Sequence, residues 1–565
     1  MVAAAVVLAG TGLAQAAEPI RFTAPVNLTK DDLDPQRTWA APSLLVSPSD
    51  PNLMLAGMHE FRSKKCSLAR STDGGRTWTR PDADPSPASY PFCVANNSNI
   101  FHSNIAWGRD NRVYMAMVGW DTPDTRTKAS VVVARSDDLG DSWETVVAHD
   151  ARPTADPQQV SLRPITGIVV DTSGSEDTVY VSYRQQFQNQ PSGSAPPVEP
   201  YIAVSTDGAR TFQTYSAMGG AFASADTRNR QLQATTTVPG FTPPTTVAGS
   251  FAATPDRVEN FGSSTNGHGL TRDNAGNLYL AFPSQTFNNV TPGQPRGIFV
   301  SKSTDGGQTW AAVQAVPFSY ENRQNTRIAW SPGGGSQGTL HVVWEAAMGR
   351  PEMNQYADLA YIRSTDGGQT WSQPSRIADD NPADLRGKYI PNITVAPNGR
   401  VDVAWWDLRD DPGVRGMDVY YAYSEDDGVT WSRNYRITDQ TIDRRYGVWA
   451  NNFDQNSPPG LASTNEVALI AWDDTRFSTG EEGQVRVDDP TNTIGVGGGV
   501  QDVFVSAVQF DTIAGGASRT TKILLAGLAG LLGVGLVLGL VTMVSRRQSG
   551  PAPTRMSPTE KAGVK

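Results

Sequence analysis

One eight-residue pattern, S-x-D-x-G-x-T/S-W, recurs six times along this 565-residue chain and constrains its fold more than any other feature. Most copies begin about 60 to 70 residues after the previous one, with one longer gap before the fourth copy. The short Ser and Asp side chains of each copy can bond the backbone of their own turn, and the Gly permits positive φ. The pattern predicts six tight turns, at Ser71–Trp78, Ser136–Trp143, Ser205–Phe212, Ser303–Trp310, Ser364–Trp371 and Ser424–Trp431.

Apolar, extended segments lie on both sides of each turn, so each turn is predicted to join two antiparallel strands. Asp358–Arg363 precedes the fifth copy, for example, and Pro374–Ala378 follows it. A second series of turn-forming segments lies upstream of the repeats and predicts seven inner hairpins. These segments are Ser47–Asn52, Gly108–Asn111, Thr172–Asp177, Asp273–Asn277, Ser331–Gly338, Pro397–Gly399 and Ser457–Thr464.

Two hairpins per repeat give four antiparallel strands, which is the composition of a propeller blade. The predicted fold is therefore all-β, a β-propeller of seven blades, with six blades and one irregular unit as the alternative. The last blade needs a fourth strand after Asp502–Gln509. Phe22–Thr29 has the pattern of the strands that follow the turns, so we expect it to complete the last blade and close the ring.

The two ends of the sequence indicate an exported, membrane-anchored protein. Residues 1–17 read as a signal peptide, with an apolar run before Ala14-Gln15-Ala16. Residues 523–544 are uncharged and long enough to cross a bilayer as a helix, and Arg546 and Arg547 follow at once. The predicted organisation is a propeller over 18–512, a linker over 513–522, a C-terminal transmembrane helix over 523–544 and a cytoplasmic tail over 545–565.

Composition excludes some partners and bears on the cysteines. The net charge of −10 argues against a nucleic-acid partner, which would need a basic face. Cys66 and Cys93 fall in the predicted exported region and are expected to form a disulfide, with two free thiols as the alternative. No cofactor motif is present and the five histidines are scattered, so neither a cofactor nor a metal site is predicted.

The functional residues are expected at one end of the propeller. Each repeat joins the third and fourth strands of a blade, so it lies at the same end as the turns between the first and second strands. The opposite end carries the loops between the second and third strands and the residues that lead into the inner strands. Aromatic and arginine side chains gather there in the sequence, as expected for a site that binds a polar sugar. They include Trp406, Trp472, Arg409, Arg476, Arg163 and Arg184.

The segments Trp406–Arg409 and Trp472–Arg476 allow two interpretations. In the first, Arg409 and Arg476 reach the axis and bind a ligand carboxylate in bidentate fashion. In the second, each neighbouring Asp pairs with its own Arg and holds the loop between the second and third strands.

The six turns resemble the Asp-boxes, or BNR repeats, of the sialidase superfamily, and the resemblance covers about residues 20 to 512. It implies a membrane-anchored protein similar to bacterial exo-α-sialidases. Such enzymes bind the substrate carboxylate with three arginines and use a Tyr nucleophile activated by Glu, with an Asp as acid/base. Carried over to this sequence, the resemblance implies the arginines Arg327, Arg409 and Arg476, the pair Tyr446 and Glu345, and the acid/base Asp121.

Two functional hypotheses follow. The first is a sialidase-like glycoside hydrolase that acts on glycans or glycoproteins at the extracellular face of the cell membrane. The second is a non-catalytic propeller that binds glycan or protein at the cell envelope. Family members carry Arg-Ile-Pro near the first blade, whereas this chain has Ala40-Ala41-Pro42 there and Tyr389-Ile390-Pro391 in a late blade, which favours the second hypothesis. The sequence leaves the oligomeric state open.

Overall fold

The structure is a computed structural model of the chain, and its compact unit of blades ends at Phe510. The residues that it describes are 20–34, 37–93, 104–121, 129–150, 161–162, 165–187, 198–217, 269–284, 297–317, 321–322, 325–333, 336–347, 357–382, 386–411, 416–443, 446–447, 457–478, 485–486, 496–497 and 500–510.

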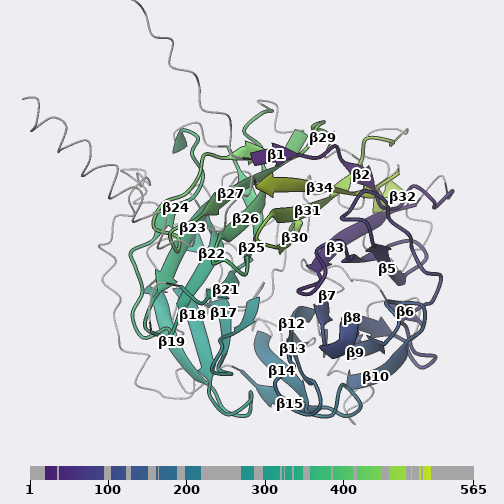
Figure 1. Cartoon of the computed structure of the whole chain (residues 1–565), viewed down its shortest axis with the longest axis horizontal. Helices are drawn as coiled ribbons and strands as arrows, with labels where there is room; N and C mark the ends of the chain where they lie inside the picture. Colours follow the sequence, from purple (N-terminus) through teal and green to yellow (C-terminus); the bar gives the residue numbers. More distant parts are fainter. Residues whose placement is uncertain are drawn as a thin grey trace, which may run out of the picture. The chain divides into compact units, whose positions relative to one another are not determined.

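Within the described residues, seven antiparallel sheets of three to five strands form the seven blades of a β-propeller (Figure 1). Blade 1 contains β3 (Trp39–Val46), β4 (Met54–Glu60) and β5 (Lys65–Ser71); blade 2 contains β7 (Asn104–Trp107), β8 (Val113–Trp120), β9 (Ala129–Ser136) and β10 (Glu144–His149); blade 3 contains β12 (Ile165–Asp171), β13 (Thr178–Phe187), β14 (Val198–Ser205) and β15 (Gln213–Ser216). Blade 4 contains β16 (Gly269–Arg272), β17 (Leu278–Ser284), β18 (Gly297–Ser303) and β19 (Ala311–Pro317); blade 5 contains β21 (Arg327–Ser331), β22 (Thr339–Ala347), β23 (Ala357–Ser364) and β24 (Ser375–Arg376). Blade 6 contains β25 (Lys388–Val395), β26 (Val401–Asp407), β27 (Gly416–Ser424) and β28 (Tyr435–Arg436); blade 7 contains β30 (Gly460–Ser463), β31 (Val467–Asp474) and β34 (Asp502–Phe510).

The N-terminal segment completes blade 7, as the sequence predicts. Strands β1 (Ile20–Phe22) and β2 (Val26–Asn27) both pair antiparallel with β34. The Arg37 guanidinium adds a bidentate ion pair to Asp502, at 2.7 and 2.9 Å. The innermost strands contact one another in sequence order, and β30 contacts β3. The ring is therefore closed by pairing between the two ends of the propeller.

Short extra elements decorate the blades. They are β6 (Phe92–Cys93), β11 (Ser161–Leu162), β20 (Glu321–Asn322), β29 (Ile442–Asp443), the paired β32 (Val485–Arg486) and β33 (Val496–Gly497), and the 3-10 turn η1 (Arg109–Asn111). One predicted turn is placed differently. The inner turn of blade 7 follows β30 at Ser463, whereas Ser457–Pro459 leads into that strand. Two prolines and a Gly made this leading segment look like a turn.

The six repeats form the hairpin turns that the sequence predicts. In each copy the third strand of the blade ends at the repeat's Ser. In blade 4, Ser303 Oγ donates to Asp305 Oδ1 at 2.8 Å and accepts from Gly307 N at 2.9 Å. Asp305 also accepts from the backbone N–H and the hydroxyl of Thr309, at 3.0 and 2.5 Å. These hydrogen bonds, led by that of the Thr309 hydroxyl, lower the pKa of Asp305 to about 2.

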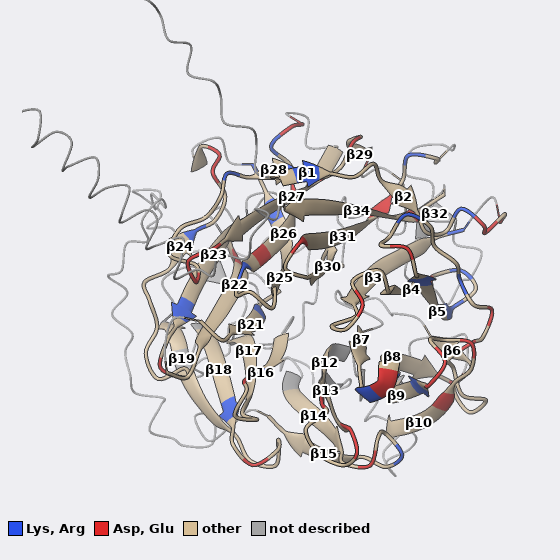
Figure 2. Cartoon of the chain, viewed as in Figure 1, with Lys and Arg blue, Asp and Glu red and all other residues tan. Residues whose placement is uncertain are grey.

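Seven clusters of buried apolar residues lie mainly between neighbouring blades. Adjacent blades bury their facing sides against each other, so their strands carry long apolar runs such as Val113–Gly119. Charged residues lie mainly in loops and at strand ends (Figure 2). Blade-to-blade packing of this kind leaves function to the loops at the two ends and to the axis.

The described residues contain no helix with the length and apolar character of a bilayer span. The predicted transmembrane segment 523–544 and the predicted signal peptide 1–17 lie outside the described residues. Cys66 and Cys93 are joined by a disulfide whose Cα atoms are 5.5 Å apart.

Candidate functional site

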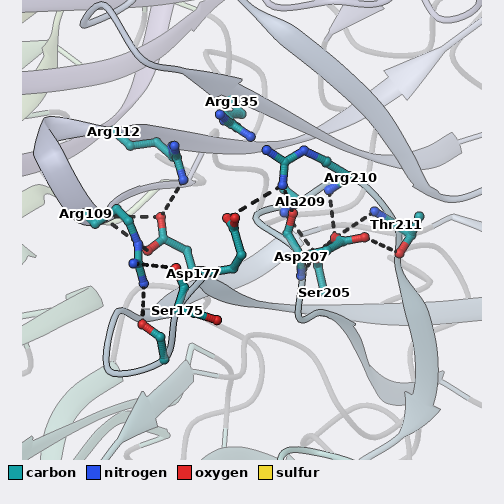
Figure 3. Close-up of polar contacts among 12 residues, drawn as sticks. Arg109, Arg112, Arg135, Ser175, Asp177, Ser205, Asp207, Ala209, Arg210 and Thr211 are labelled. Atoms are coloured by element: carbon teal, nitrogen blue, oxygen red, sulfur yellow. Dashed lines mark hydrogen bonds and ion pairs between the residues drawn. The ribbon is translucent and has the colours of Figure 1, made fainter.

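At the end of the propeller that carries the Asp-boxes, several charged groups pair with one another. The first box meets the inner turn of its own blade, since Gly74 N donates to Asn52 O at 3.0 Å. Between blades 2 and 3, buried Asp177 accepts from Arg109 Nε at 2.8 Å and from Arg112 Nη1 at 3.2 Å (Figure 3). It also accepts from Tyr114 Oη at 2.9 Å. Burial alone would raise the pKa of Asp177, but its hydrogen bonds to Arg109 and Tyr114 lower it below its usual value. We therefore place the candidate site on the axis and at the opposite end.

A cavity of about 170 Å³ lies on the axis of the propeller. Residues from the innermost segment of every blade line it, so all seven blades contribute to one space. Its lining residues are Pro42, Ser43, Leu44, Asn104, Ile105, Gly167, Ile168, Gly269, Leu270, Arg327, Ile328, Asn392, Ile393, Pro458 and Leu461.

Arg327 is the charged residue of this described lining. The strand register gives Arg327 the same place in blade 5 that Asn392 has in blade 6, because they pair with Val343 and Ala404 on the second strands. Gly269 of blade 4 packs so closely that an added Cβ would lie 2.8 Å from the backbone N of Ile328. Burial lowers the pKa of the Arg327 guanidinium to about 10, and the charge of Glu345 opposes that effect. A buried cation at the axis can attract an anionic group of a ligand.

Glu345, the predicted partner of the nucleophile, joins blade 5 to blade 6. Its Oε1 accepts from Asn325 Nδ2 at 2.8 Å and from the backbone N–H of Ile390, which has a φ of 49°. Asp473 occupies the matching place in blade 7, and its Oδ1 accepts from the backbone N–H of Ala41, with a φ of 56°, at 3.0 Å. Both carboxylates therefore hold a positive-φ residue at the start of the next blade.

Arg409 belongs to a buried polar group in blade 6 that also contains Trp405 and Asp407. Asp407 Oδ2 accepts from Trp405 Nε1 at 2.8 Å and from Arg409 Nε at 2.9 Å. The guanidinium of Arg409 also donates to Asp379 Oδ1 at 2.7 Å and lies 4.2 Å from the ring centroid of Tyr420. We call this Trp–Asp–Arg arrangement the staple.

Blade 7 repeats the staple with Trp472, Asp474 and Arg476. Trp472 Nε1 donates to Asp474 Oδ2 at 2.9 Å, and Arg476 Nη2 donates to the same oxygen at 2.8 Å. Arg476 also donates to Asp439 Oδ1 at 2.6 Å. Arg409 and Arg476 thus bind carboxylates of the chain itself and are not among the residues that line the axial cavity. These contacts match the second of the two interpretations, in which the Asp and Arg hold their own loop.

Trp406 and Trp472 do not form exposed platforms for a sugar, which corrects their predicted role. Both side chains are fully buried between blades. Trp406 Nε1 donates to Ser457 O of the next blade at 2.8 Å. The residue that matches Trp472 is Trp405, which the sequence analysis missed. A bulge between Tyr389 and Asn392 shifts the register, and the tandem tryptophans concealed which of them faces blade 5.

The remaining predicted residues are placed less completely. Tyr446 lies between β29 and β30, and its backbone N–H donates to Asp443 O at 3.4 Å. Asp121 follows β8 directly and is partly exposed. Arg184 pairs with Pro200 in the backbone of blade 3, whereas its side chain and the whole of Arg163 lie outside the described residues. The pairing of Tyr446 with Glu345 and the role of Asp121 stay predictions.

No group of three His, Cys, Asp or Glu side chains suited to hold a metal ion occurs within the part of the chain that the structure describes.

Comparison with known proteins finds one repeat family and several similar proteins. The BNR/Asp-box repeat family model matches residues 362–373, at the fifth repeat. A sialidase of Clostridium perfringens is 27% identical over 112 residues, which is 18% of this chain and 29% of the sialidase. The match thus spans less than a third of that relative's length.

Two solved structures are similar at low sequence identity. The Penicillium chrysogenum α-L-arabinanase with bound arabinobiose has a TM-score of 0.39 and 14% identity, over 68% of this chain and 94% of that one. The phage phi92 endosialidase has a TM-score of 0.41 and 11% identity, over 88% of this chain and 70% of that one. By its six Asp-boxes, its seven blades and the matching repeat model, the chain is a seven-bladed β-propeller with Asp-box repeats.

Proposed function

We propose that this propeller is a sialidase-like glycoside hydrolase whose axial site binds an acidic sugar of a glycan or glycoprotein. Arg327 in the lining of the axial cavity is the observation that carries the proposal. A guanidinium is suited to a sugar carboxylate, because it can bind one through two charge-assisted hydrogen bonds. The sequence similarity to a sialidase supports the same substrate class.

The chemistry would come from three side chains that are not among the described lining residues of the axial cavity. Tyr446 is the proposed nucleophile, Glu345 its activating group and Asp121 the acid/base, in the arrangement that retaining sialidases use. Glu345 already accepts hydrogen bonds from Asn325 and Ile390, so it would activate Tyr446 in addition to holding these two residues.

Hydrolysis of a fluorogenic sialoside by the purified outer domain, residues 18–512, tests the proposal. We expect turnover by the native protein and a loss of at least about 100-fold in kcat/KM in Arg327→Ala, because a charged hydrogen-bonding partner of the substrate is removed. Tyr446→Phe should abolish turnover while binding persists. Circular dichroism and thermal melts of both variants establish that the propeller is intact. Unchanged turnover in Arg327→Ala would contradict the proposal that Arg327 binds the substrate.

The staples favour a second candidate function, a propeller that binds a glycan without cleaving it. Arg409 and Arg476 are engaged by carboxylates of their own blades, so three arginines around one substrate carboxylate are not assembled from the described residues. A glycan array that reports binding of acidic glycans, together with no sialoside turnover, would select this candidate.

We also propose that the propeller acts on the outside of the cell membrane, held by the segment 523–544. The uncharged run and the arginines behind it support this topology. Protease added to intact cells should remove the propeller and leave the tail 545–565 protected, whereas protection of the propeller would reverse the topology.

A further inference from the structure

Phe477 is an exposed aromatic residue at the end of blade 7 opposite the Asp-boxes. It follows β31 in the loop between the second and third strands, and 51% of its surface is exposed. Among the described residues the other exposed aromatic is Phe22, which pairs with Val508 at the Asp-box end of the same blade. Single exposed apolar residues are common on protein surfaces, so a second observation is needed to indicate a site. A comparison of blades 6 and 7 supplies it.

In blade 6 the loop that the staple holds ends in a polar pair. Arg409 is followed by Asp410, and the guanidinium of Arg409 lies 4.2 Å from the ring centroid of Tyr420. Tyr420 Oη donates to Asp410 Oδ2 at 2.7 Å. The hydroxyl and the carboxylate therefore satisfy each other.

In blade 7 phenylalanine replaces both members of that pair. Arg476 is followed by Phe477, and the guanidinium of Arg476 lies 4.2 Å from the ring centroid of Phe504. Phe504 matches Tyr420, because each pairs with the tryptophan of its own staple. The ring centroids of Phe477 and Phe504 are 6.2 Å apart, with 36° between the ring planes. The same staple thus carries a closed polar pair in blade 6 and a half-exposed apolar ring in blade 7.

Hydrogen bonds on both sides fix the turn that carries Phe477. Ser478 N donates to Thr475 O at 2.8 Å and closes the turn. Ser478 Oγ donates to Val500 O at 2.6 Å. Thr475 Oγ1 donates to Asp443 O, at 2.9 Å, in the segment that leads into blade 7. A ring on a turn held in this way loses little conformational freedom when a ligand stacks on it.

Asp439 adds a carboxylate to this apolar surface. Its Oδ1 accepts from Arg476 Nη2 at 2.6 Å, and half of the Asp439 side chain is exposed. The hydrogen bond from Arg476 is the main cause that lowers the pKa of Asp439, so the carboxylate is ionised at neutral pH. An ionised carboxylate accepts strong hydrogen bonds from hydroxyl groups but repels another carboxylate. An apolar ring with such an acceptor suits a neutral sugar, which has an apolar C–H face and hydroxyl donors, better than an acidic one.

We propose that Phe477 and Asp439 bind a neutral pyranose ring of a glycan. The apolar face of the sugar stacks on the Phe477 ring, and its hydroxyl groups donate to the Asp439 carboxylate. Neither residue lines the axial cavity, so this site is distinct from the one that contains Arg327. It requires no hydrolysis and goes beyond the proposed function, because it serves a glycosidase and a non-catalytic glycan-binding propeller equally.

Saturation-transfer NMR of the full-length protein with lactose tests the proposal, because lactose is uncharged and presents two pyranose rings. The double variant Phe477→Asp, Phe504→Tyr gives blade 7 the polar pair of blade 6. We expect it to bind lactose at least about fivefold more weakly than the native protein, because the stacking ring is lost. Its Tm should change little, since blade 6 holds the same pair on the same staple. Phe22→Ala, which removes the exposed ring at the Asp-box end, is the matched control and should keep the native affinity.

The site can also be moved to blade 6. Asp379, which donates no proton and bonds Arg409 from a half-exposed position, matches Asp439 there. Adding Asp410→Phe and Tyr420→Phe to the double variant should therefore restore lactose binding, now on blade 6. Binding that does not return would contradict the claim that an exposed ring and a carboxylate on the staple make the site.

The outcomes separate this site from the axial one. Arg327→Ala should leave lactose binding unchanged. A native protein that binds no lactose, or a double variant that binds it as well as the native protein does, would overturn this proposal and leave the proposed function standing. Self-association of the native protein on size-exclusion chromatography that the double variant loses would overturn it as well, because the exposed ring would then contact a second copy of the chain.

Discussion

Single buried carboxylates determine how neighbouring blades join. Asp473 is fully buried at the seam between blades 7 and 1, where it accepts from Ala41 N and bonds Ser457 Oγ at 2.8 Å. Burial raises the pKa of Asp473 to about 7, and its neighbour Asp474 adds to the effect. Asp473 has no proposed role in binding or catalysis, yet its pKa is strongly raised at this seam.

Asp473 should make the stability of the propeller depend on pH. The folded state keeps the proton up to about pH 7, whereas the unfolded chain releases it near the ordinary value of 3.8. Stability from this group is therefore greatest below about pH 4 and falls as pH rises towards 7, by at most about 4 kcal/mol. Denaturant titrations between pH 4 and pH 8 should show a steeper decline for the native protein than for Asp473→Asn. Parallel curves for the two proteins would contradict this assignment.

At the scale of structural elements, the staple holds a loop that follows a fully buried strand. Asp407 is buried and receives hydrogen bonds from an indole, a guanidinium and the backbone N–H of Arg409. Although burial lowers it, the pKa of Arg409 is raised above its ordinary value by Asp407. The arrangement repeats in blade 7, so it is a property of the blade and not of one site.

Removal of the staple's carboxylate should be costly. Asp407→Ala leaves the buried indole N–H of Trp405 without its acceptor and removes the most buried of the carboxylates that Arg409 contacts, and we expect a loss of about 2 to 4 kcal/mol of stability. Asp379→Ala is the control, because Asp379 bonds the same arginine from a half-exposed position and should cost less than about 1 kcal/mol. Urea unfolding of both variants measures the difference. Equal losses would mean that Asp407 is no more important than a surface partner.

How well an element can be predicted from the sequence depends on how far apart in the chain its interacting residues lie. The Asp-box turns are predictable because their hydrogen bonds close within eight residues, as between Ser303 and Gly307. The order of the strands follows from the repeat. In blade 6 the Asp and the Arg of the staple were identified from the sequence but Trp406 was taken for its tryptophan, since only the bulged pairing of β25 with β26 shows that Trp405 faces blade 5. The difference between Trp344, whose indole N–H has no partner among the described residues, and the tryptophans that donate to Asp407 and Asp474 could not be predicted, because it depends on the strand register.

At the scale of the whole molecule, the ring is stabilised by its closure. Strands β1 and β2 cover the outer edge of β34, and Thr29 Oγ1 and Arg37 both donate to the buried carboxylate of Asp502. Closure removes an unpaired edge that would otherwise recruit another strand. Removal of the N-terminal segment with β1 and β2 should therefore lower the stability of the propeller by more than the loss of these two strands alone would.

A chain that begins at Lys30 tests the contribution of closure. We expect a lower Tm, a broader calorimetric transition and concentration-dependent association on size-exclusion chromatography, because β34 becomes a free edge. A synthetic peptide of residues 20–29 should restore the Tm by adding the missing strands. The chain that begins at Glu18 is the reference. An unchanged Tm in the shortened chain would show that the seam contributes little.

The pairing of Ile20 with Phe510 also means that the first strand of the propeller is synthesised long before its partner. The first strand to leave the ribosome has no partner until the last strand has been made, so it waits through the synthesis of almost the whole propeller. A chain that ends before β34 therefore lacks the strand with which its first strand pairs.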